Sequence, residues 1–217
     1  MRVRTFTGGG FGENAYLVVC EATGRAAAVD PGAGADRMAD AIREEGLELQ
    51  AVLLTHAHID HVDGIPEIRR VAPEVPIYLH DEARPMYRGA QHQAAMFGID
   101  LEELPEPTDE LAHGQIYPLG EERFEVRYAP GHAPGHVILV SDDQSMALVG
   151  DVVFQGSIGR TDLPGGDMRT LMSSIREQVL SLPDDTVLYS GHGPPTTVGA
   201  ERTGNPFLVP HYGGGLG

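Results

Sequence analysis

The chain has 217 residues, of which 32 are acidic and 15 are basic, so its formal net charge is −17 with neutral histidines; every basic residue is an arginine. A field of this sign repels polyphosphate backbones, which argues against nucleic acid as a substrate. The single cysteine, Cys20, can form no intramolecular disulfide. No window approaches the ~18 apolar residues of a membrane span, and the N-terminus lacks a signal-peptide pattern. We therefore expect a cytoplasmic protein with no membrane partner.

The expected elements follow from apolar runs and from the turn-forming residues between them. Short, strongly apolar runs predict strands, and apolar residues at helical spacing predict helices. In chain order the predicted elements are strands at 3–7, 14–20 and 25–29, a helix at 36–45, a strand at 50–54, a helix at 65–71, strands at 77–80, 124–128, 137–140 and 146–149, a helix at 167–180 and a strand at 186–189. The segment 81–111, rich in proline, methionine and acidic residues, is expected to be a short helix followed by a long surface excursion.

Strand-rich blocks alternate with helices in two halves, which are residues 1 to about 110 and residues 111 to 217. Periodicity alone allows either an α/β or an α+β class. The halves fit two sheets packed face to face with helices outside, in one domain spanning 1–217. The glycine-rich tail 213–217 is expected to be disordered.

Five polar motifs each follow a predicted strand directly. They are residues 55–61 (THAHIDH), residues 130–136 (PGHAPGH), Gly150-Asp151, Gly191-His192-Gly193 and Asp30-Pro31-Gly32. Imidazole nitrogen and carboxylate oxygen are ligands that bind Zn²⁺ and similar ions well. Burying several histidines and carboxylates without partners would be costly, so these motifs predict a metal site.

The three histidines and one aspartate of the first motif lie within six residues, too close together for all four to reach one tetrahedral ion comfortably. His56 and His58 lie two residues apart on a loop, so their side chains can point to the same ion. Asp60 and His61 fall at the next turn and can reach a second ion. The motif therefore predicts a site for two metals.

Three later residues complete the two metal spheres. We expect His132 to join the first ion and His192 to join the second, while Asp151, which has two oxygens, bridges the pair. Each of the three follows a glycine, and a residue without Cβ lets the backbone turn sharply and aim its neighbour inward.

The remaining histidines lack ligand spacing. His136, four residues after His132, is expected to be structural. Surface or capping roles are expected for the others, which are His80, His92, His113 and His211.

Together with Asn14-Ala15-Tyr16-Leu17 near the start and Asn205-Pro206 near the end, these motifs resemble the metallo-β-lactamase superfamily. Within it they look most like the glyoxalase II (hydroxyacylglutathione hydrolase) group, in the short, single-domain bacterial form without a C-terminal helical domain. The resemblance spans nearly the whole chain. It implies an α+β fold, the αββα metallo-β-lactamase sandwich of two mixed sheets, with the same seven metal ligands along one sheet edge.

The resemblance implies hydrolysis of a thioester such as S-lactoylglutathione by a hydroxide that bridges two divalent metals, zinc or iron, with manganese also suitable. Asp60 and Asp151 would be the catalytic carboxylates. The segment Gly159-Arg160-Thr161-Asp162 resembles the substrate-side loop, where Arg160 would meet the glutathione moiety or another thiol.

Other activities share these ligands. The strongest rival is a glutathione persulfide dioxygenase, which resembles the same group and holds a single Fe(II) at the equivalents of His56, His132 and Asp151. Lactone or β-lactam hydrolysis needs the same metal chemistry. A non-catalytic metal-binding domain is a fourth possibility, against which the intact ligand set argues. The sequence carries no signal for an oligomeric state.

Overall fold

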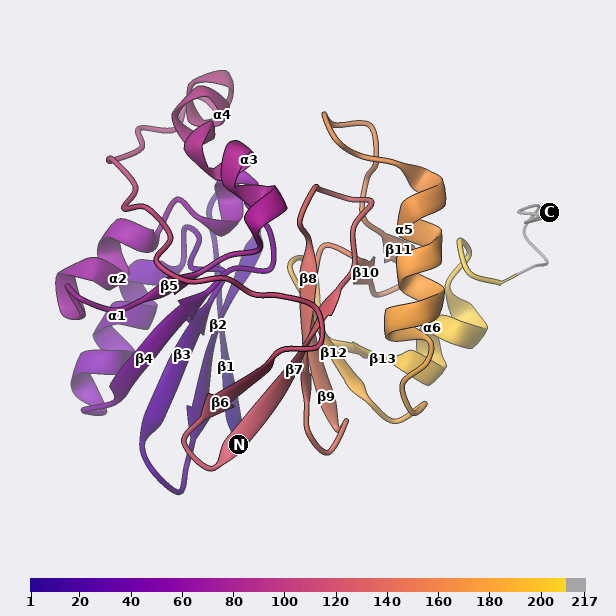
Figure 1. Cartoon of the computed structure of the whole chain (residues 1–217), viewed down its shortest axis with the longest axis horizontal. Coiled ribbons are helices and arrows are strands. Elements are labelled where there is room, and N and C mark those ends of the chain that lie inside the picture. Colours follow the sequence, from indigo (N-terminus) through magenta and orange to yellow (C-terminus); the bar gives the residue numbers. More distant parts are fainter. Residues whose placement is uncertain (210–217) are drawn as a thin grey trace.

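Two mixed β-sheets pack face to face, and helices cover both outer faces, over the residues that the computed structural model describes, 1–209 (Figure 1). The first sheet has the order β1 (Arg2–Gly8), β2 (Glu13–Cys20), β3 (Arg25–Val29), β4 (Glu48–Leu53) and β5 (Ile77–Tyr78). The second has the order β13 (Thr196–Thr197), β12 (Val187–Ser190), β9 (Met146–Gly150), β8 (Val137–Ser141), β7 (Glu122–Tyr128) and β6 (Ile116–Leu119). Each sheet contains parallel and antiparallel pairs, such as β3 with β4 and β1 with β2.

Separate helices cover each sheet. The outer face of the first sheet carries α1 (Ala35–Glu44) and α2 (Ile65–Val71). The outer face of the second carries α5 (Met168–Ser174), its π-helical continuation η3 (Ile175–Val179), and α6 (Val198–Gly204). The predicted α+β class and αββα sandwich are therefore confirmed. The helix expected at 167–180 begins at Met168, because the Asp167 side chain caps it by accepting from Thr170 N.

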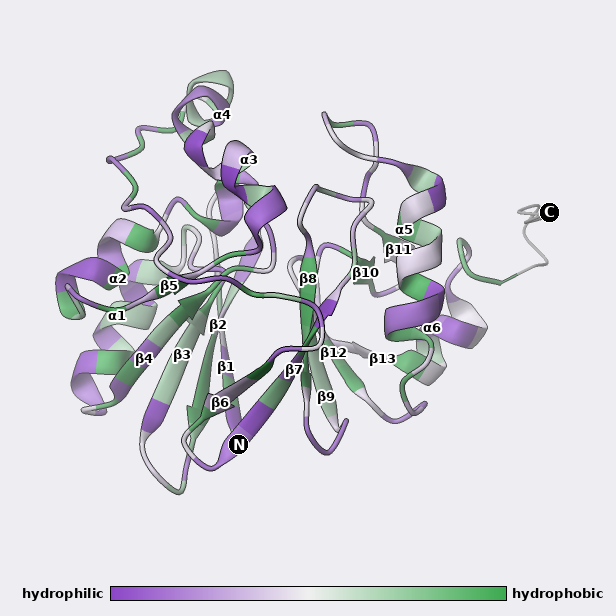
Figure 2. Ribbon diagram, in the orientation of Figure 1, coloured by the Kyte–Doolittle hydropathy of each residue, from purple (hydrophilic) through white to green (hydrophobic). Residues whose placement is uncertain are grey.

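Strand β2 shows why the layers stack in this way. Its side chains alternate between two hydrophobic clusters, as the two-residue period of a strand requires. Leu17 and Val19 face the cluster beneath α1 and α2, whereas Tyr16 and Val18 face the second sheet. Such a strand is buried along its whole length and carries a continuous apolar run, and Figure 2 shows the hydrophobic colouring gathered on the central strands.

The excursion at 81–111 is more ordered than the sequence predicted. A 3₁₀ turn, η2 (Asp81–Ala83), leads into two helices, α3 (Arg84–Arg88) and α4 (Ala90–Phe97), where one helix was expected. The Tyr87 hydroxyl donates to the Pro105 carbonyl at 2.7 Å, which ties the following loop to α3. The expectation of a disordered tail at 213–217 lies outside the described residues.

Some short elements were not predicted. Strand β6 contains Pro118, which lowers its strand signal, but a proline is tolerated there because β6 is the edge of its sheet. The hairpin of β10 (Val153–Phe154) and β11 (Ser157–Ile158) is too short to give a periodic signal. Within residues 1–209, no helix has the length and apolar character needed to cross a membrane.

Candidate metal centre

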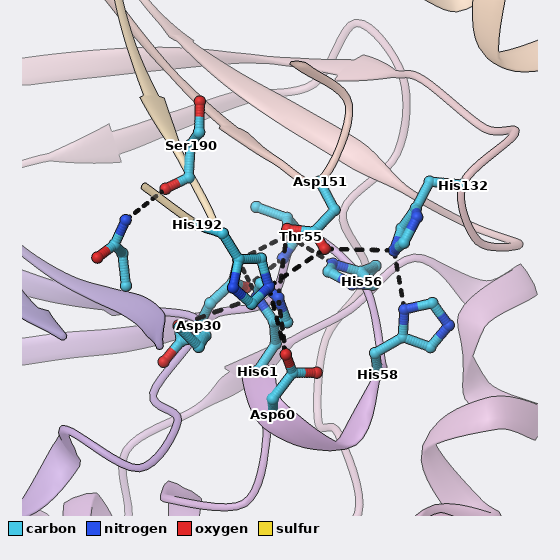
Figure 3. A network of polar contacts seen from close by, with 12 residues as sticks. Asp30, Thr55, His56, His58, Asp60, His61, His132, Asp151, Ser190 and His192 are labelled. Carbon is cyan, nitrogen blue, oxygen red and sulfur yellow. Dashed lines mark hydrogen bonds and ion pairs between the residues drawn. The ribbon is translucent and has the colours of Figure 1, made fainter. Parts of the chain in front are cut away.

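The seven predicted ligands come together at the ends of four strands, where the two sheets share an edge (Figure 3). The loop after β4 supplies four of them, and its last turn, η1 (Ile59–His61), carries two. The other three follow β7, β9 and β12, which belong to the second sheet. The first half of the chain therefore meets the second half at this cluster.

The first group consists of His56, His58 and His132. One nitrogen of each imidazole lies within 4.8 Å of the others. The closest pair is His58 Nδ1 and His132 Nε2, at 2.8 Å. All three rings are buried, with at most 8% of any residue exposed. Three converging, buried imidazoles are a suitable set of protein ligands for one divalent ion.

The second group consists of Asp60, His61 and His192, and its ligand atoms also lie within 4.8 Å of one another. His192 Nε2 lies 3.3 Å from Asp60 Oδ2. His61 Nε2 lies 3.9 Å from the same oxygen. This mixed set of two imidazoles and a carboxylate is suited to a second divalent ion.

Asp151 lies between the two groups. Its Oδ2 is 3.5 Å from His132 Nε2 in the first group and 3.4 Å from His192 Nε2 in the second. Its Oδ1 is 3.4 Å from His61 Nε2. Figure 3 shows the carboxylate between His132 and His192. One carboxylate thus contacts histidines of both groups, which is the position that a bridging ligand requires.

Hydrogen bonds fix the orientation of four of the five histidines through the nitrogen that faces away from the cluster. His56 Nδ1 lies 3.0 Å from Thr55 Oγ1, and His61 Nδ1 lies 3.2 Å from Asp30 Oδ2. His132 Nδ1 and His192 Nδ1 contact backbone carbonyls, at 2.8 and 3.2 Å. Such partners set the tautomer and aim of a metal-binding imidazole.

Several atoms on the inner side of the cluster have no hydrogen-bond partner among the described residues. They include His56 Nε2, His61 Nε2 and Asp151 Oδ1, all buried. Unpartnered buried polar atoms are rare because each costs about 1–3 kcal/mol. Two divalent ions would satisfy them, so the donor set fits a dinuclear metal centre.

Asp30 forms a third close group with His56 and His61, but its contacts indicate a supporting role. Its oxygens accept from Thr55 N at 2.7 Å and from Thr55 Oγ1 at 2.6 Å, as well as contacting His61. These oxygens are therefore already used. Asp30 orients one histidine of each metal group, since the Thr55 hydroxyl that it holds also contacts His56.

The two groups differ in their electrostatics. Burial lowers the pKa of His58 to about 4 and that of His56 well below its usual value, so these imidazoles are neutral. Burial also acts on His61 and His192, but Asp151 and its neighbouring carboxylates outweigh it and raise the pKa of His192 to about 10. The second group therefore carries protons that a metal ion has to displace.

The glycines before the ligands serve two different purposes. Gly131 and Gly150 have positive φ angles of 123° and 48°, which confirms the need for a sharp turn. Gly191 instead provides space, because a Cβ there would lie 2.2 Å from Asp151 Oδ1. A side chain at this position would displace the proposed bridging carboxylate.

His136 supports the site, as expected. It is fully buried, stacks on His56 with ring centroids 4.7 Å apart, and its Nε2 accepts from Asp151 N at 3.1 Å. Surface or capping positions are confirmed for His80, His92 and His113, of which His80 caps η2 by accepting from Glu82 N. His211 lies outside the described residues.

Strand β2 anchors the loop that carries His192. The Asn14 amide donates to the carbonyls of Ser190, at 3.1 Å, and Gly193, at 2.7 Å. The Tyr16 hydroxyl donates to the same Ser190 carbonyl at 2.6 Å. These hydrogen bonds connect the first sheet to the second. The Asn14-Ala15-Tyr16 motif therefore holds the loop that carries His192.

Glu13 is a supporting residue that the sequence did not reveal, because it begins an ordinary strand. It is 1% exposed, and its Oε1 lies 3.9 Å from His61 Nδ1. Burial raises the pKa of this carboxyl to about 10. Gly32 makes room for it, since a Cβ there would lie 2.3 Å from Glu13 Oε2. Asp30 was easier to find in the sequence, because it begins one of the motifs at a strand end. Its supporting role became visible only in the structure.

A pocket with a volume of about 350 Å³ opens on the ligand cluster. This volume is at the lower end of the range for small-molecule sites. Its residues, apart from the proposed ligands, are Phe11, Ile59, Gln93, Phe97, Phe154, Ser157, Ile158, Arg160 and Leu163. Arg160 lines the pocket, and its predicted contact with the substrate stays a prediction. Its guanidinium is exposed and donates two 2.7 Å hydrogen bonds to Asp162, while its carbonyl contacts His132.

An αββα sandwich with histidines and aspartates clustered at its strand ends defines a class of metal-binding proteins. This chain belongs to the metallo-β-lactamase superfamily, whose family model matches residues 8–192. It is 39% identical over 184 residues to hydroxyacylglutathione hydrolase GloC of Haemophilus influenzae, covering 84% of this chain and 87% of that protein.

Two solved structures have the same fold at substantial identity. TTHA1623, in a di-iron-bound form, has a TM-score of 0.86 and 39% identity, covering 95% of this chain and all of that one. BLEG-1, named as a B3 metallo-β-lactamase, has a TM-score of 0.86 and 34% identity, covering 96% of this chain and 100% of that one. The names of the two structures indicate a metal, and the names of GloC and BLEG-1 indicate different substrates.

Proposed function

We propose that the protein is a dinuclear metal-dependent hydrolase of thioesters. The first ion would be held by His56, His58 and His132, and the second by Asp60, His61 and His192. Asp151 would bridge the two. The observation that carries this assignment is the position of Asp151, whose oxygens lie 3.4–3.5 Å from histidines of both groups.

Two divalent ions at this cluster would supply a nucleophilic hydroxide at neutral pH and would stabilise the oxyanion that forms when it attacks a carbonyl. The chain would hold them with two carboxylates, those of Asp60 and Asp151, so the centre would keep a positive charge. The pKa of Asp60 is lowered even though burial opposes ionisation, because His192 and His61 lie beside it. The lowered pKa favours the ionised carboxylate, which would orient the nucleophile.

The pocket favours a thioester over substrates with poorer leaving groups. A thiolate leaves without prior protonation, since the thiol pKa is near 8.5, whereas an amine leaving group needs a proton donor. Apart from the proposed ligands, Arg160 is the one titratable side chain among the described residues that line the pocket. A relative named hydroxyacylglutathione hydrolase, at 39% identity, supports the same substrate class.

A β-lactam is the second candidate substrate, because a structure with 34% identity bears the name of a B3 metallo-β-lactamase. Persulfide oxidation at a single Fe(II) would use only His56, His132 and Asp151. That reaction does not require the second group, in which His192 Nε2 lies 3.3 Å from Asp60 Oδ2. The dinuclear hydrolase explains more of the buried polar groups.

The test is the metal content of protein purified without added metal, measured together with turnover of S-lactoylglutathione, a chromogenic cephalosporin and glutathione persulfide. We expect about two ions per chain and thioester cleavage that chelation abolishes. Replacing His56 with alanine should remove one ion and the activity, whereas replacing the exposed His113 should change neither. One iron per chain with oxygen consumption on the persulfide, or faster cleavage of the cephalosporin, would refute the proposal.

A further inference from the structure

Three phenylalanines form an aromatic wall of the pocket, which we define as Phe11, Phe97 and Phe154. The rings of Phe11 and Phe97 meet edge to face, with centroids 5.1 Å apart, and these residues are 45% and 53% exposed. Phe154 contacts the ring of His192, with centroids 5.8 Å apart. Large apolar side chains left this exposed around a pocket are typical of a ligand-binding surface.

Two hydrogen bonds connect the aromatic wall and its helix to the loops that carry the proposed ligands. The Phe11 carbonyl lies 3.2 Å from His192 Nδ1, so the residue that contributes a ring also orients a proposed ligand. Phe97 ends α4, and Gln93 of the same helix donates to the carbonyl of Ala57, between the first two histidines, at 3.3 Å. The wall therefore lines the same pocket as the proposed ligands.

The pocket offers little to bind the carboxylates of glutathione. Among the described residues that line it, Arg160 is the one with a permanent positive charge. Its guanidinium is already engaged by Asp162 through two hydrogen bonds of 2.7 Å. The net charge of −17 also repels an anionic ligand. Recognition therefore depends on apolar contacts more than on charge.

We propose that the aromatic wall binds the acyl group of the substrate, so that the protein prefers thioesters of apolar, ring-sized acids over those of small polar acids such as lactate. This inference rests on the proposed thioester hydrolysis. The acyl group and the thiol are both attached to the reacting carbonyl, but a charged thiol such as glutathione matches the apolar wall poorly, so we assign the wall to the acyl group. The thiol portion extends toward the pocket mouth and contributes little to selection.

The test measures binding separately from turnover. Isothermal titration of metal-loaded protein compares phenylacetate with acetate, two products that present the same carboxylate and differ in the apolar ring. In parallel, kcat/KM is measured for the phenylacetyl and acetyl thioesters of N-acetylcysteamine and of glutathione. We expect a preference for the phenyl compounds of about tenfold or more, and little difference between the two thiols.

Phe97→Ala should reduce that preference by about fivefold or more without changing metal content, because a phenylalanine ring offers no ligand atom to a metal ion. Phe207→Ala removes an equally exposed ring outside the pocket and should leave the preference unchanged. Equal binding of phenylacetate and acetate, or a preference that Phe97→Ala does not reduce, would overturn the inference even if thioesters are cleaved. Selective binding of phenylacetate without thioester cleavage would refute the proposed hydrolase activity and leave the acyl pocket standing.

Discussion

Replacing Asp30 with asparagine tests whether the support behind the histidines controls metal affinity. The substitution keeps the shape of the side chain, and asparagine tolerates the positive φ of 47° at this position. Asp30 Oδ2 contacts both Thr55 Oγ1 and His61 Nδ1. If the amide oxygen keeps the bond from Thr55 N, the amide nitrogen faces His61 Nδ1 as a donor.

His61 can satisfy that donor only by accepting at Nδ1, which moves its proton to Nε2, the atom that faces the metal cluster. Loss of a supporting partner of this kind costs about 10–100-fold in metal affinity. At about 1.4 kcal/mol per tenfold change, the expected loss is about 1.4–2.8 kcal/mol at the second site. The first site should weaken less, because Asp30 reaches His56 only through the Thr55 hydroxyl.

Competition with a chromophoric chelator measures both affinities, and thermal unfolding of the metal-free protein shows whether the fold is intact. Asp40→Asn makes the same chemical change at an exposed ion pair on α1 and serves as the control. A second-site affinity within about twofold of the parent would refute the reasoning, since it would show that Asp30 does not set the tautomer of His61.

Three further predictions concern the glycine support, the protons and the core. Gly191→Ala should abolish binding of the second ion, because its Cβ would lie 2.2 Å from Asp151 Oδ1; two retained metals by elemental analysis would contradict this. Since the pKa values of His61 and His192 are raised, second-site affinity should increase with pH, and calorimetry in several buffers should detect proton release; a pH-independent affinity would contradict this. Phe124→Ala should lower the free energy of unfolding by about 3–5 kcal/mol in urea titration, and a loss under about 1 kcal/mol would show that the ring is not packed as described.

The sequence predicted the long elements and the metal cluster because both leave local signals. Strand β2 carries a continuous apolar run, and the ligands follow the ends of predicted strands in short polar motifs. The pairing of His132 with His58, 74 residues apart, followed from ligand chemistry and from the family resemblance, and the 2.8 Å contact agrees with it.

What the sequence did not predict depends on contacts between distant segments. Glu13 begins a strand and shows no sign of burial until Gly32 packs against it. Phe11 lies in a glycine-rich turn, and Phe97 ends a helix that was not expected, so their contact could not be foreseen. Gly191 was expected to provide a turn, and only the packed site shows that it provides space.

The two halves of the chain meet at the proposed ligands, with four from the first sheet and three from the second. Metal ions there would act as a clamp between the sheets, so unfolding either half would release them. By mass action, metal at a hundred times its dissociation constant would add about 2.7 kcal/mol of stability per site. The stability of the folded chain would then depend on the metal supply. At low metal concentration the protein would be easier to unfold and to degrade. Its abundance would therefore fall together with its activity.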